Sequence, residues 1–334
     1  MKVLFIGGTG IISSACSELA ILKGIDLYHL NRGKSSQTRE IKGVKTIISD
    51  IRDVDQTKDA LKDYTFDVIV DFIAYNPEHI QNDILLFDGK AKQFIFISTA
   101  SAYQEPEKLP VTEESPLGNP YWEYSRNKIA CEELLINSNK KTGFPYTIVR
   151  PSHTYDKTLL PLIGDYTAFD RMRKGLPVVI PGDGTSIWTL TNHRDFAVGL
   201  VGLLGNPNAI NEAFHITSDE WLTWNQIYSI FASELKIIPK FVHIPSDIVY
   251  RYNNDFGAGI IGDKSHSMIF DNSKIKRFVP DFNPQIKFAE GAKEIVKWYT
   301  ENPGFREPNS GINSLMDKMI ADFEIFTSNI NSDL

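Results

Sequence analysis

Cysteine and long apolar runs are scarce in this sequence of 334 residues. The two cysteines, Cys16 and Cys131, lack the spacing of metal ligands and are too few for a disulfide framework, so we interpret both as packing residues in a reducing compartment. No stretch approaches 18 consecutive apolar residues, and glycines interrupt the short apolar N-terminal segment. We therefore expect a cytoplasmic protein without membrane contact.

Basic runs, metal motifs and low-complexity tracts are also missing. The formal net charge is −7, so the sequence offers no electrostatic footprint for a nucleic-acid backbone. The seven histidines show no metal-binding spacing, and no nucleophile elbow accompanies them. With 42% hydrophobic residues the chain has enough apolar content for a full core and a second lobe. We predict a small-molecule substrate, and neither nucleic acid nor metal as a ligand.

Strand-like and helix-like segments alternate along the first half of the chain. The strand-like runs lie at residues 1–6, 26–30, 44–49, 67–71, 93–98 and 146–150, with helix-length stretches at about 53–63, 77–90 and 121–142. This alternation predicts an α/β fold with a Rossmann-type doubly wound parallel sheet. The carboxyl ends of such strands meet at one edge, where ligands bind.

The first strand runs directly into Gly7-Gly8-Thr9-Gly10, and a helix follows that ends at Lys23-Gly24. Glycines at a helix N-terminus hold a pyrophosphate through backbone N–H groups and the helix dipole. Any tight strand-to-helix junction also uses glycine, so the motif by itself leaves both interpretations open. The β-α-β unit around it favours a dinucleotide site.

Tyr124 and Lys128 are four residues apart on the predicted helix 121–142 and therefore share one face. A free tyrosine, with a pKa near ~10, is a poor base at neutral pH, and a neighbouring ammonium lowers the pKa of a phenol. Such a pair is common on exposed helices. Together with the dinucleotide pattern and the Ser98-Thr99 segment, it predicts an acid–base site.

The pattern changes after Pro151, where glycine, proline and aromatic residues become frequent and the alternation loosens. We predict a dinucleotide-binding domain over 1–150, to which 191–218 return. A smaller C-terminal substrate-binding lobe would comprise 151–190 and 219–300. A helical tail would occupy 301–334, because Leu315, Met319, Phe323 and Phe326 have helical spacing.

Six motifs in chain order resemble those of the extended short-chain dehydrogenases/reductases, specifically the NAD-dependent epimerase/dehydratase family, over roughly residues 1–300. They are Gly7-Gly8-Thr9-Gly10, Asp50-Ile51-Arg52-Asp53, the segment from Phe96 to Tyr103, Tyr124 with Lys128, Arg150-Pro151, and Pro181-Gly182-Asp183-Gly184. The resemblance implies an NAD(P)-dependent oxidoreductase or epimerase that acts on a hydroxyl or keto carbon of a sugar-type substrate, including nucleotide sugars. It also implies a homodimer.

The resemblance assigns roles to individual residues. The catalytic set is Thr99, Tyr124 and Lys128. The cofactor-binding set is Gly7, Thr9, Gly10, Ile11, Ile12, Asn31, Arg32, Asp50, Ile51, Ala74, Ser98, Lys128 and Pro151. The substrate set is Ser101, His153 and Trp188, and no residue is assigned to a metal.

Five positions depart from the family pattern. Ser13 replaces a third glycine of the loop. Ala100-Ser101 stands where dehydratases have Asp-Glu, which disfavours that reaction. His153 and Trp188 replace an Asn and an Arg that bind a diphosphate.

The end of the second strand bears on the choice of cofactor. It reads Asn31-Arg32 and lacks the carboxylate that accepts the ribose 2′-OH of NAD. NADP is therefore predicted, with NAD as the alternative if Arg32 stacks on adenine instead.

Two other functions remain open. One is a ketoreductase that acts on a small carbonyl compound without a nucleotide. The other is a non-catalytic, RNA-associated or redox-sensing member, because the serine-containing glycine loop is similar to that of the chloroplast stem-loop-binding proteins. Intact Tyr124 and Lys128 and the acidic charge balance favour the enzyme.

Overall fold

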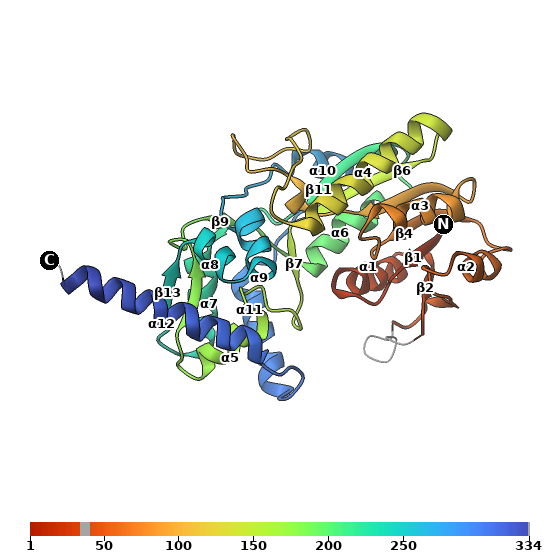
Figure 1. The fold of residues 1–334 in the computed structure, drawn as a ribbon. Coiled ribbons are helices and arrows are strands. Elements are labelled where there is room, and N and C mark those ends of the chain that lie inside the picture. Colours follow the sequence, from red (N-terminus) through yellow and green to blue (C-terminus); the bar gives the residue numbers. More distant parts are fainter. Residues whose placement is uncertain (34–40, 333–334) are drawn as a thin grey trace. The chain divides into compact units, whose positions relative to one another are not determined.

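The structure, a computed structural model, describes residues 1–33 and 41–332, which form two compact units (Figure 1). The first unit comprises Met1–Thr154, Thr191–Asp219 and Phe270–Gln285. The second comprises Tyr155–Leu190, Glu220–Ile269 and the chain from Ile286 on. Among the described residues, no helix combines the length and the apolar character needed to cross a membrane.

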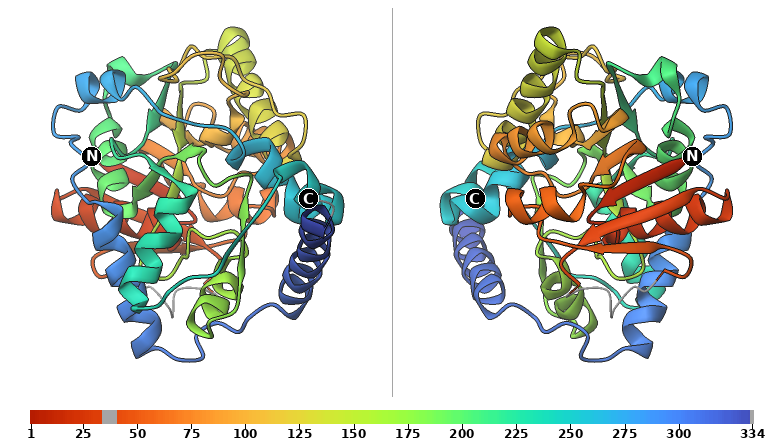
Figure 2. Two further views of the ribbon diagram at one scale, coloured as in Figure 1. Left: turned by 90° about the vertical axis from the view of Figure 1, so that its left-hand side faces the viewer. Right: turned by 90° about the vertical axis from the view of Figure 1, so that its right-hand side faces the viewer.

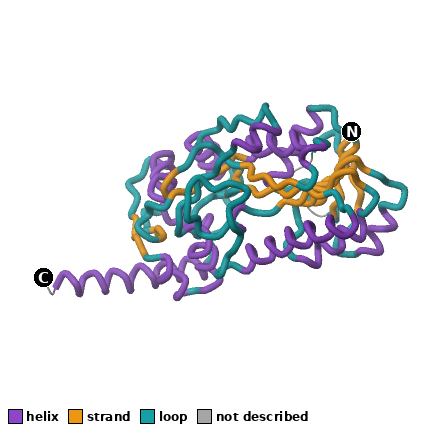
Figure 3. Tube along the Cα trace, turned by 90° about the horizontal axis from the view of Figure 1, so that it is seen from above, coloured by secondary structure: helices purple, strands orange, loops and turns teal. Residues whose placement is uncertain are grey.

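A seven-stranded parallel sheet forms the centre of the first unit, with the strand order β11-β6-β5-β4-β1-β2-β3. Figure 3 shows strands in orange between helices in purple. The strands are β1 (Lys2–Ile6), β2 (Asp26–Asn31), β3 (Lys45–Ile48), β4 (Phe66–Asp71), β5 (Ala91–Ile97), β6 (Tyr146–Pro151) and β11 (Glu212–Ile216). The predicted Rossmann-type doubly wound sheet is confirmed. The six expected strands are present, and β11 is a seventh that the sequence pattern did not reveal.

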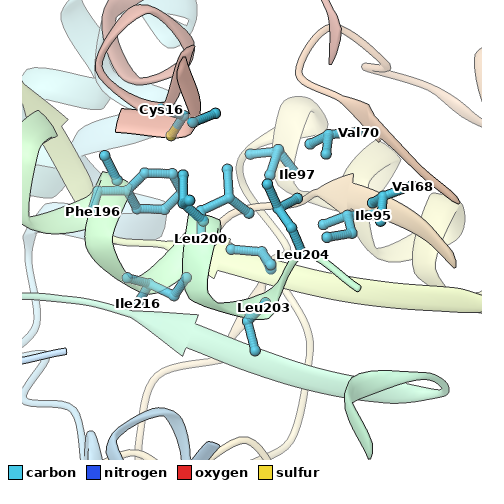
Figure 4. Packing of buried hydrophobic residues seen from close by; sticks show 14 of the residues in the cluster. Cys16, Val68, Val70, Ile95, Ile97, Phe196, Leu200, Leu203, Leu204 and Ile216 are labelled. Atoms are coloured by element: carbon cyan, nitrogen blue, oxygen red, sulfur yellow. The ribbon is translucent and has the colours of Figure 1, made fainter. Parts of the chain in front are cut away.

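Helices cover both faces of this sheet. One face carries α1 (Ile11–Leu22) and α6 (His193–Leu203), and the other carries α2 (Val54–Ala60), α3 (Pro77–Phe87) and α4 (Glu123–Thr142). Successive residues of β1 enter opposite cores: Val3 and Phe5 pack below α1, whereas Leu4 and Ile6 pack on the α3 and α4 side. Figure 4 shows Phe196 and Leu200 of α6 near Cys16 and the β4 and β5 side chains.

The domain boundaries differ from the expected ones at residues 270–285. These residues were predicted to lie in the substrate-binding lobe but belong to the first unit. Asn272 donates a hydrogen bond to the carbonyl oxygen of Thr217 over 2.9 Å. After it, α10 (Ser273–Phe278) contributes Ile275 to the core that contains α1 and α6. This packing depends on contacts between distant segments that local sequence cannot show.

The second unit contains small sheets and several helices (Figure 2). Its strands are β8 (Val178–Pro181) paired with β13 (Phe241–Ile244), and β9 (Ile187–Trp188) paired with β12 (Leu222–Thr223). Its helices are α5 (Asp165–Arg173), α7 (Trp224–Leu235), α8 (Ser246–Tyr252), α9 (Asn254–Gly259), α11 (Phe288–Glu301) and α12 (Ser310–Ser332), with the π-helix η3 (Ile260–Lys264). The chain leaves the first unit in β7 (His153–Tyr155) and returns in β10 (Leu190–Asn192); η1 (Ala100–Ala102) and η2 (Pro207–Ala209) are short turns of the first unit.

The tail predicted over 301–334 contains α12, which packs against α5 and α8 within the second unit. Met316, Met319 and Ile320 are buried, and Phe326 is exposed. Residues 333–334 lie outside the described part of the chain.

Candidate functional site

The glycine loop between β1 and α1 has room for almost no side chain. Gly7 has a φ of +81°, and a Cβ built there would lie 2.5 Å from Cγ2 of Ile73. A Cβ at Gly8 would lie 2.3 Å from Nε2 of His29. Backbone conformation and close approach both favour glycine at Gly7, and close approach alone favours it at Gly8.

Ser13, at the position of the missing third glycine, is a buried part of this loop. Its hydroxyl donates to the carbonyl oxygen of Gly7 over 2.8 Å and accepts from the N–H of Gly10 over 2.7 Å. One turn later, Ser17 Oγ lies 2.8 Å from Nε2 of His29. Burial lowers the pKa of His29 to about 4, so the imidazole is neutral at physiological pH.

The N-terminus of α1 opens on a cleft of about 520 Å³ within the first unit. Gly10 is the N-cap, and the first turn has no acidic residue, so the N–H groups of Ile11 and Ile12 and the helix dipole favour an anion. The wall includes Gly7, Thr9, Gly10, Asn31, Arg32, Asp50 and Ile51, all of which were predicted to bind the cofactor. These residues fit a dinucleotide.

Arg32 and Asn31 lie where β2 ends at the cleft. Arg32 is exposed, and Oδ1 of Asn31 accepts the N–H of Gly33 over 2.9 Å, which leaves the side-chain amide as a donor. At the end of β3, Oε1 of Gln56 accepts the N–H of Asp50, and Ile51 is buried. Donors rather than acceptors therefore predominate at the β2 end of the cleft.

Lys128 is buried on α4, at 2% exposure. Its Nζ donates to the carbonyl oxygen of Ala74 over 2.6 Å and to that of Ile97 over 2.7 Å. The ammonium lies 5.1 Å from the ring centroid of Tyr75, a wall residue of the cleft, and 5.7 Å from that of Tyr124. Burial lowers the pKa of Lys128 to about 8.

A chain of hydroxyl groups follows the end of β5. Thr99 is half-buried, and its Oγ1 lies 3.0 Å from Oγ of Ser101. Ser101 in turn lies 2.7 Å from the Oγ of Ser125, the residue after Tyr124 on α4. Tyr124 is half-buried, with its ring centroid 5.0 Å from that of Trp122. The turn after β5 is thus linked to the start of α4, where the predicted catalytic residues lie.

Ser98 belongs to a buried network that the sequence did not reveal. Its hydroxyl donates to Oε1 of Glu132 over 2.5 Å, and Glu132 forms a salt bridge of 2.6 Å with Arg150. Arg150 also donates to the hydroxyl of Tyr103 over 3.0 Å. The network joins the carboxyl ends of β5 and β6, next to the buried Pro151. A buried Glu and Arg at separate strand and helix positions carry no local signal of their pairing.

The predicted substrate residues are distributed over both units. Ser101 and the half-buried His153 belong to the first unit. Trp188 belongs to the second, where it is 2% exposed and has the Nζ of Lys264 5.9 Å from its ring. Within the described chain, no group of three His, Cys, Asp or Glu side chains could hold a metal ion.

Comparisons with known proteins agree with this geometry. A sequence model described as "NAD dependent epimerase/dehydratase family" matches residues 3–217. The chloroplast stem-loop binding protein of 41 kDa b from Arabidopsis thaliana is 26% identical over 314 residues, which cover 90% of this chain and 75% of that protein. A UDP-glucose 4-epimerase from Lactobacillus helveticus is 29% identical over 168 residues, 45% of this chain and 51% of that protein.

Solved structures show the same fold. The UDP-glucuronic acid 4-epimerase of Bacillus cereus, in complex with UDP-glucuronic acid and NAD, superimposes with a TM-score of 0.74. The match covers 90% of this chain and all of that one, at 20% sequence identity.

Proposed function

Because the chain belongs to the NAD-dependent epimerase/dehydratase family, we propose that it oxidises or epimerises a hydroxyl-bearing carbon of a sugar-type substrate, with nucleotide sugars as the leading class. It is an enzyme of that family and uses a nicotinamide cofactor. The reaction and the residues that perform it are the subject of the proposal.

One observation carries the proposal: Nζ of Lys128 lies within 6 Å of the ring centroids of both Tyr75, in the cleft wall, and Tyr124. The phenol that would move a proton is therefore close to the site that would hold the cofactor. Burial excludes water from Lys128, so its charge acts on nearby groups in a medium of low dielectric constant.

In this proposal the phenolate oxygen of Tyr124 accepts the proton of the substrate hydroxyl, and the resulting phenol can return it; the ammonium of Lys128 favours the phenolate. Below a pH of about 8, the pKa of Lys128, this ammonium is charged. Thr99 would donate a hydrogen bond to the substrate oxygen. When bound, the nicotinamide supplies a hydride acceptor and donor.

We assign cofactor binding to residues of the cleft wall and of the α1 N-terminus, and to four buried residues that do not line the cleft. Gly7, Thr9 and Gly10, with the N–H groups of Ile11 and Ile12, would hold the pyrophosphate. Asp50 and Ile51 would hold adenine; Ala74, Ser98, Lys128 and Pro151 would surround the nicotinamide end. We propose NADP as the preferred cofactor because Arg32 and the amide of Asn31 are donors suited to a 2′-phosphate, with NAD as the alternative.

The proposal extends to the rest of the molecule. We assign cofactor binding to the first unit and substrate selection, through Trp188, to the second, and we expect a cytoplasmic homodimer. Ser101 and His153 would contact the substrate from the first unit.

The test is Tyr124→Phe, with Tyr121→Phe as the matched control on an exposed tyrosine before α4. Turnover is followed by nicotinamide absorbance over a panel of UDP- and dTDP-sugars and small ketones, and cofactor affinity by calorimetry. Tyr124→Phe should lower turnover by roughly 10²–10⁴-fold and leave cofactor affinity unchanged, because it deletes only the proton-moving hydroxyl. Full turnover in this variant would refute the catalytic role.

A second candidate function rests on the Arabidopsis relative, which is named for stem-loop binding and aligns with 90% of this chain. The net charge of −7 argues against it, because phosphate backbones are bound through clustered Lys and Arg. Titration of a labelled RNA stem-loop at several salt concentrations separates the two candidates. Tight, salt-dependent binding would favour the RNA-associated function.

A further inference from the structure

Unpartnered polar atoms converge where β4 ends in the first unit. Asp71 and Asp83 are both fully buried. Oδ1 of Asp71 accepts the N–H of Ile73 over 2.5 Å and that of Ala74 over 2.9 Å. Within the described part of the chain, however, four buried polar atoms have no hydrogen-bond partner: Oδ2 of Asp71, both carboxyl oxygens of Asp83 and Nη1 of Arg52. Buried polar atoms in such a state require an explanation.

A shared proton supplies that explanation. Burial raises the pKa of Asp83 well above its ordinary value, and the neighbouring carboxylate of Asp71 raises it further. A protonated Asp83 carries one O–H donor, which it gives to the carboxylate of Asp71. Two ionised carboxylates in this place would repel each other without water to screen them.

The pair is connected to Lys128 through the backbone. Asp71 holds the N–H of Ala74, and the carbonyl oxygen of Ala74 accepts from Nζ of Lys128 over 2.6 Å. Nη2 of Arg52 donates to the carbonyl oxygen of Ile73, on the same turn. Asp83 lies on α3, which packs against α4, the helix that carries Lys128 (Figure 1).

Asp71 is the carboxylate best placed to balance the charge of Lys128. Its negative charge raises the pKa of Lys128, although burial lowers that pKa by a larger amount. Glu132 is already in a salt bridge with Arg150. Burial raises the pKa of Cys131 to about 12, so its thiol is neutral. Asp71 and Arg52 act on both Lys128 and Asp83, and Cys131 and Glu132 act on Lys128. The titratable side chains of Tyr75, Tyr124 and His79 also lie near Lys128.

We propose that Asp71 and Asp83 share one proton and act together as positioning residues for Lys128. Asp71 accepts hydrogen bonds from the turn that contains Ala74 and supplies one negative charge. Asp83 carries the proton, so the pair has a single charge. The catalytic meaning of this device rests on the proposed function, which places Lys128 beside Tyr124. The device itself is a property of the cofactor-free protein and is measured there.

The first measurement is the infrared spectrum of the cofactor-free protein at neutral pH. A band from a protonated carboxylic acid should be present in the wild type and absent in Asp83→Asn. Asp88→Asn, the same substitution at an exposed position at the end of the same helix, should retain it. A spectrum without the band, or a band that persists in Asp83→Asn, overturns the shared proton.

The second measurement is the titration of Lys128, followed by carbon NMR of labelled lysine Cε and assigned by the signal lost in Lys128→Met. Asp83→Asn should leave the midpoint of the Lys128 titration unchanged, because the amide of the new asparagine donates the same hydrogen bond to Asp71. Asp71→Asn should lower the midpoint, because the balancing charge is gone. If the Lys128 titration has the same midpoint in both variants and in the wild type, the positioning role is overturned. If Asp71→Asn does not fold, the infrared band of Asp83→Asn still tests the shared proton.

The two proposals fail separately. Full turnover in Tyr124→Phe removes the proposed function but leaves the carboxylic acid band and the Lys128 titration as they are. A missing band removes the shared proton but leaves the result for Tyr124→Phe unaffected.

Discussion

Ser13 donates a hydrogen bond from Oγ to the carbonyl oxygen of Gly7 over 2.8 Å, across the glycine loop. The same hydroxyl accepts the N–H of Gly10, the N-cap of α1, over 2.7 Å. Ser13 thus links the first and last glycines of the loop, at a position where the family usually has glycine. Its hydroxyl is part of the structure of the cofactor loop.

Ser13→Ala should therefore lower the free energy of unfolding by about 1–3 kcal/mol, because it removes two hydrogen bonds, to the half-buried Gly7 and the exposed Gly10, at about 0.5–1.5 kcal/mol each. Cofactor affinity should fall as well, since the loop loses its closure. The measurements are urea unfolding and calorimetry. Ser14→Ala is the control, because the Ser14 hydroxyl bonds only to Ile11 in its own helical turn. Equal stability of Ser13→Ala and wild type would contradict the role of Ser13.

His29 should make the protein less stable in acid. Its pKa is about 4 in the folded protein, against 6.5 as its ordinary value. Between these pH values only the unfolded chain takes up the proton, so the free energy of unfolding falls as the pH falls below 6.5. The loss reaches roughly 3 kcal/mol at about 1.36 kcal/mol per pKa unit. Chemical unfolding of wild type and His29→Gln at several pH values isolates this contribution; parallel curves would show that His29 does not cause it.

Arg32→Ala should separate the two cofactors. If Arg32 binds the 2′-phosphate, the variant loses roughly 1.5–3 kcal/mol of binding free energy for NADP, the range for a hydrogen bond to a charged group, and little for NAD. Calorimetry with both cofactors measures the difference. Arg277→Ala, in α10 and outside the cleft, is the control. Equal losses for NADP and NAD would instead indicate that Arg32 stacks on adenine.

UDP, dTDP and GDP should bind the cofactor-loaded protein weakly, with dissociation constants above about 0.1 mM, or about −5.5 kcal/mol. The reason is that, by the family resemblance, His153 and Trp188 stand where an Asn and an Arg would bind the diphosphate. Arg171 does not compensate, because it is 2% exposed and paired with Asp317 over 2.7 Å. Calorimetry with each nucleotide is the measurement. Tight binding of one of them would assign the diphosphate to Arg173 or Arg194 and strengthen the sugar-nucleotide proposal.

Local sequence determined much of this protein. The apolar runs of β1, β4, β5 and β6 became buried parallel strands because burial on both faces needs continuous apolar residues, whereas β3 lies at the edge of the sheet and buries only Ile47. The glycine loop was recognisable because its backbone leaves no room for side chains. Tyr124 and Lys128 were found together because a spacing of four residues places them on one face of α4. The family followed from the order of these motifs and is confirmed by the match over residues 3–217.

The tertiary structure alone decided the groups that meet across long stretches of chain. Asp71 and Asp83 are an ordinary strand residue and an ordinary helix residue until α3 packs on the sheet and removes water from both. Glu132 and Arg150 pair across a helix and a strand, and residues 270–285 join the first unit through Asn272 and Ile275. None of these pairings has a fixed sequence spacing, because each depends on how separate elements pack, and packing is set by the whole core.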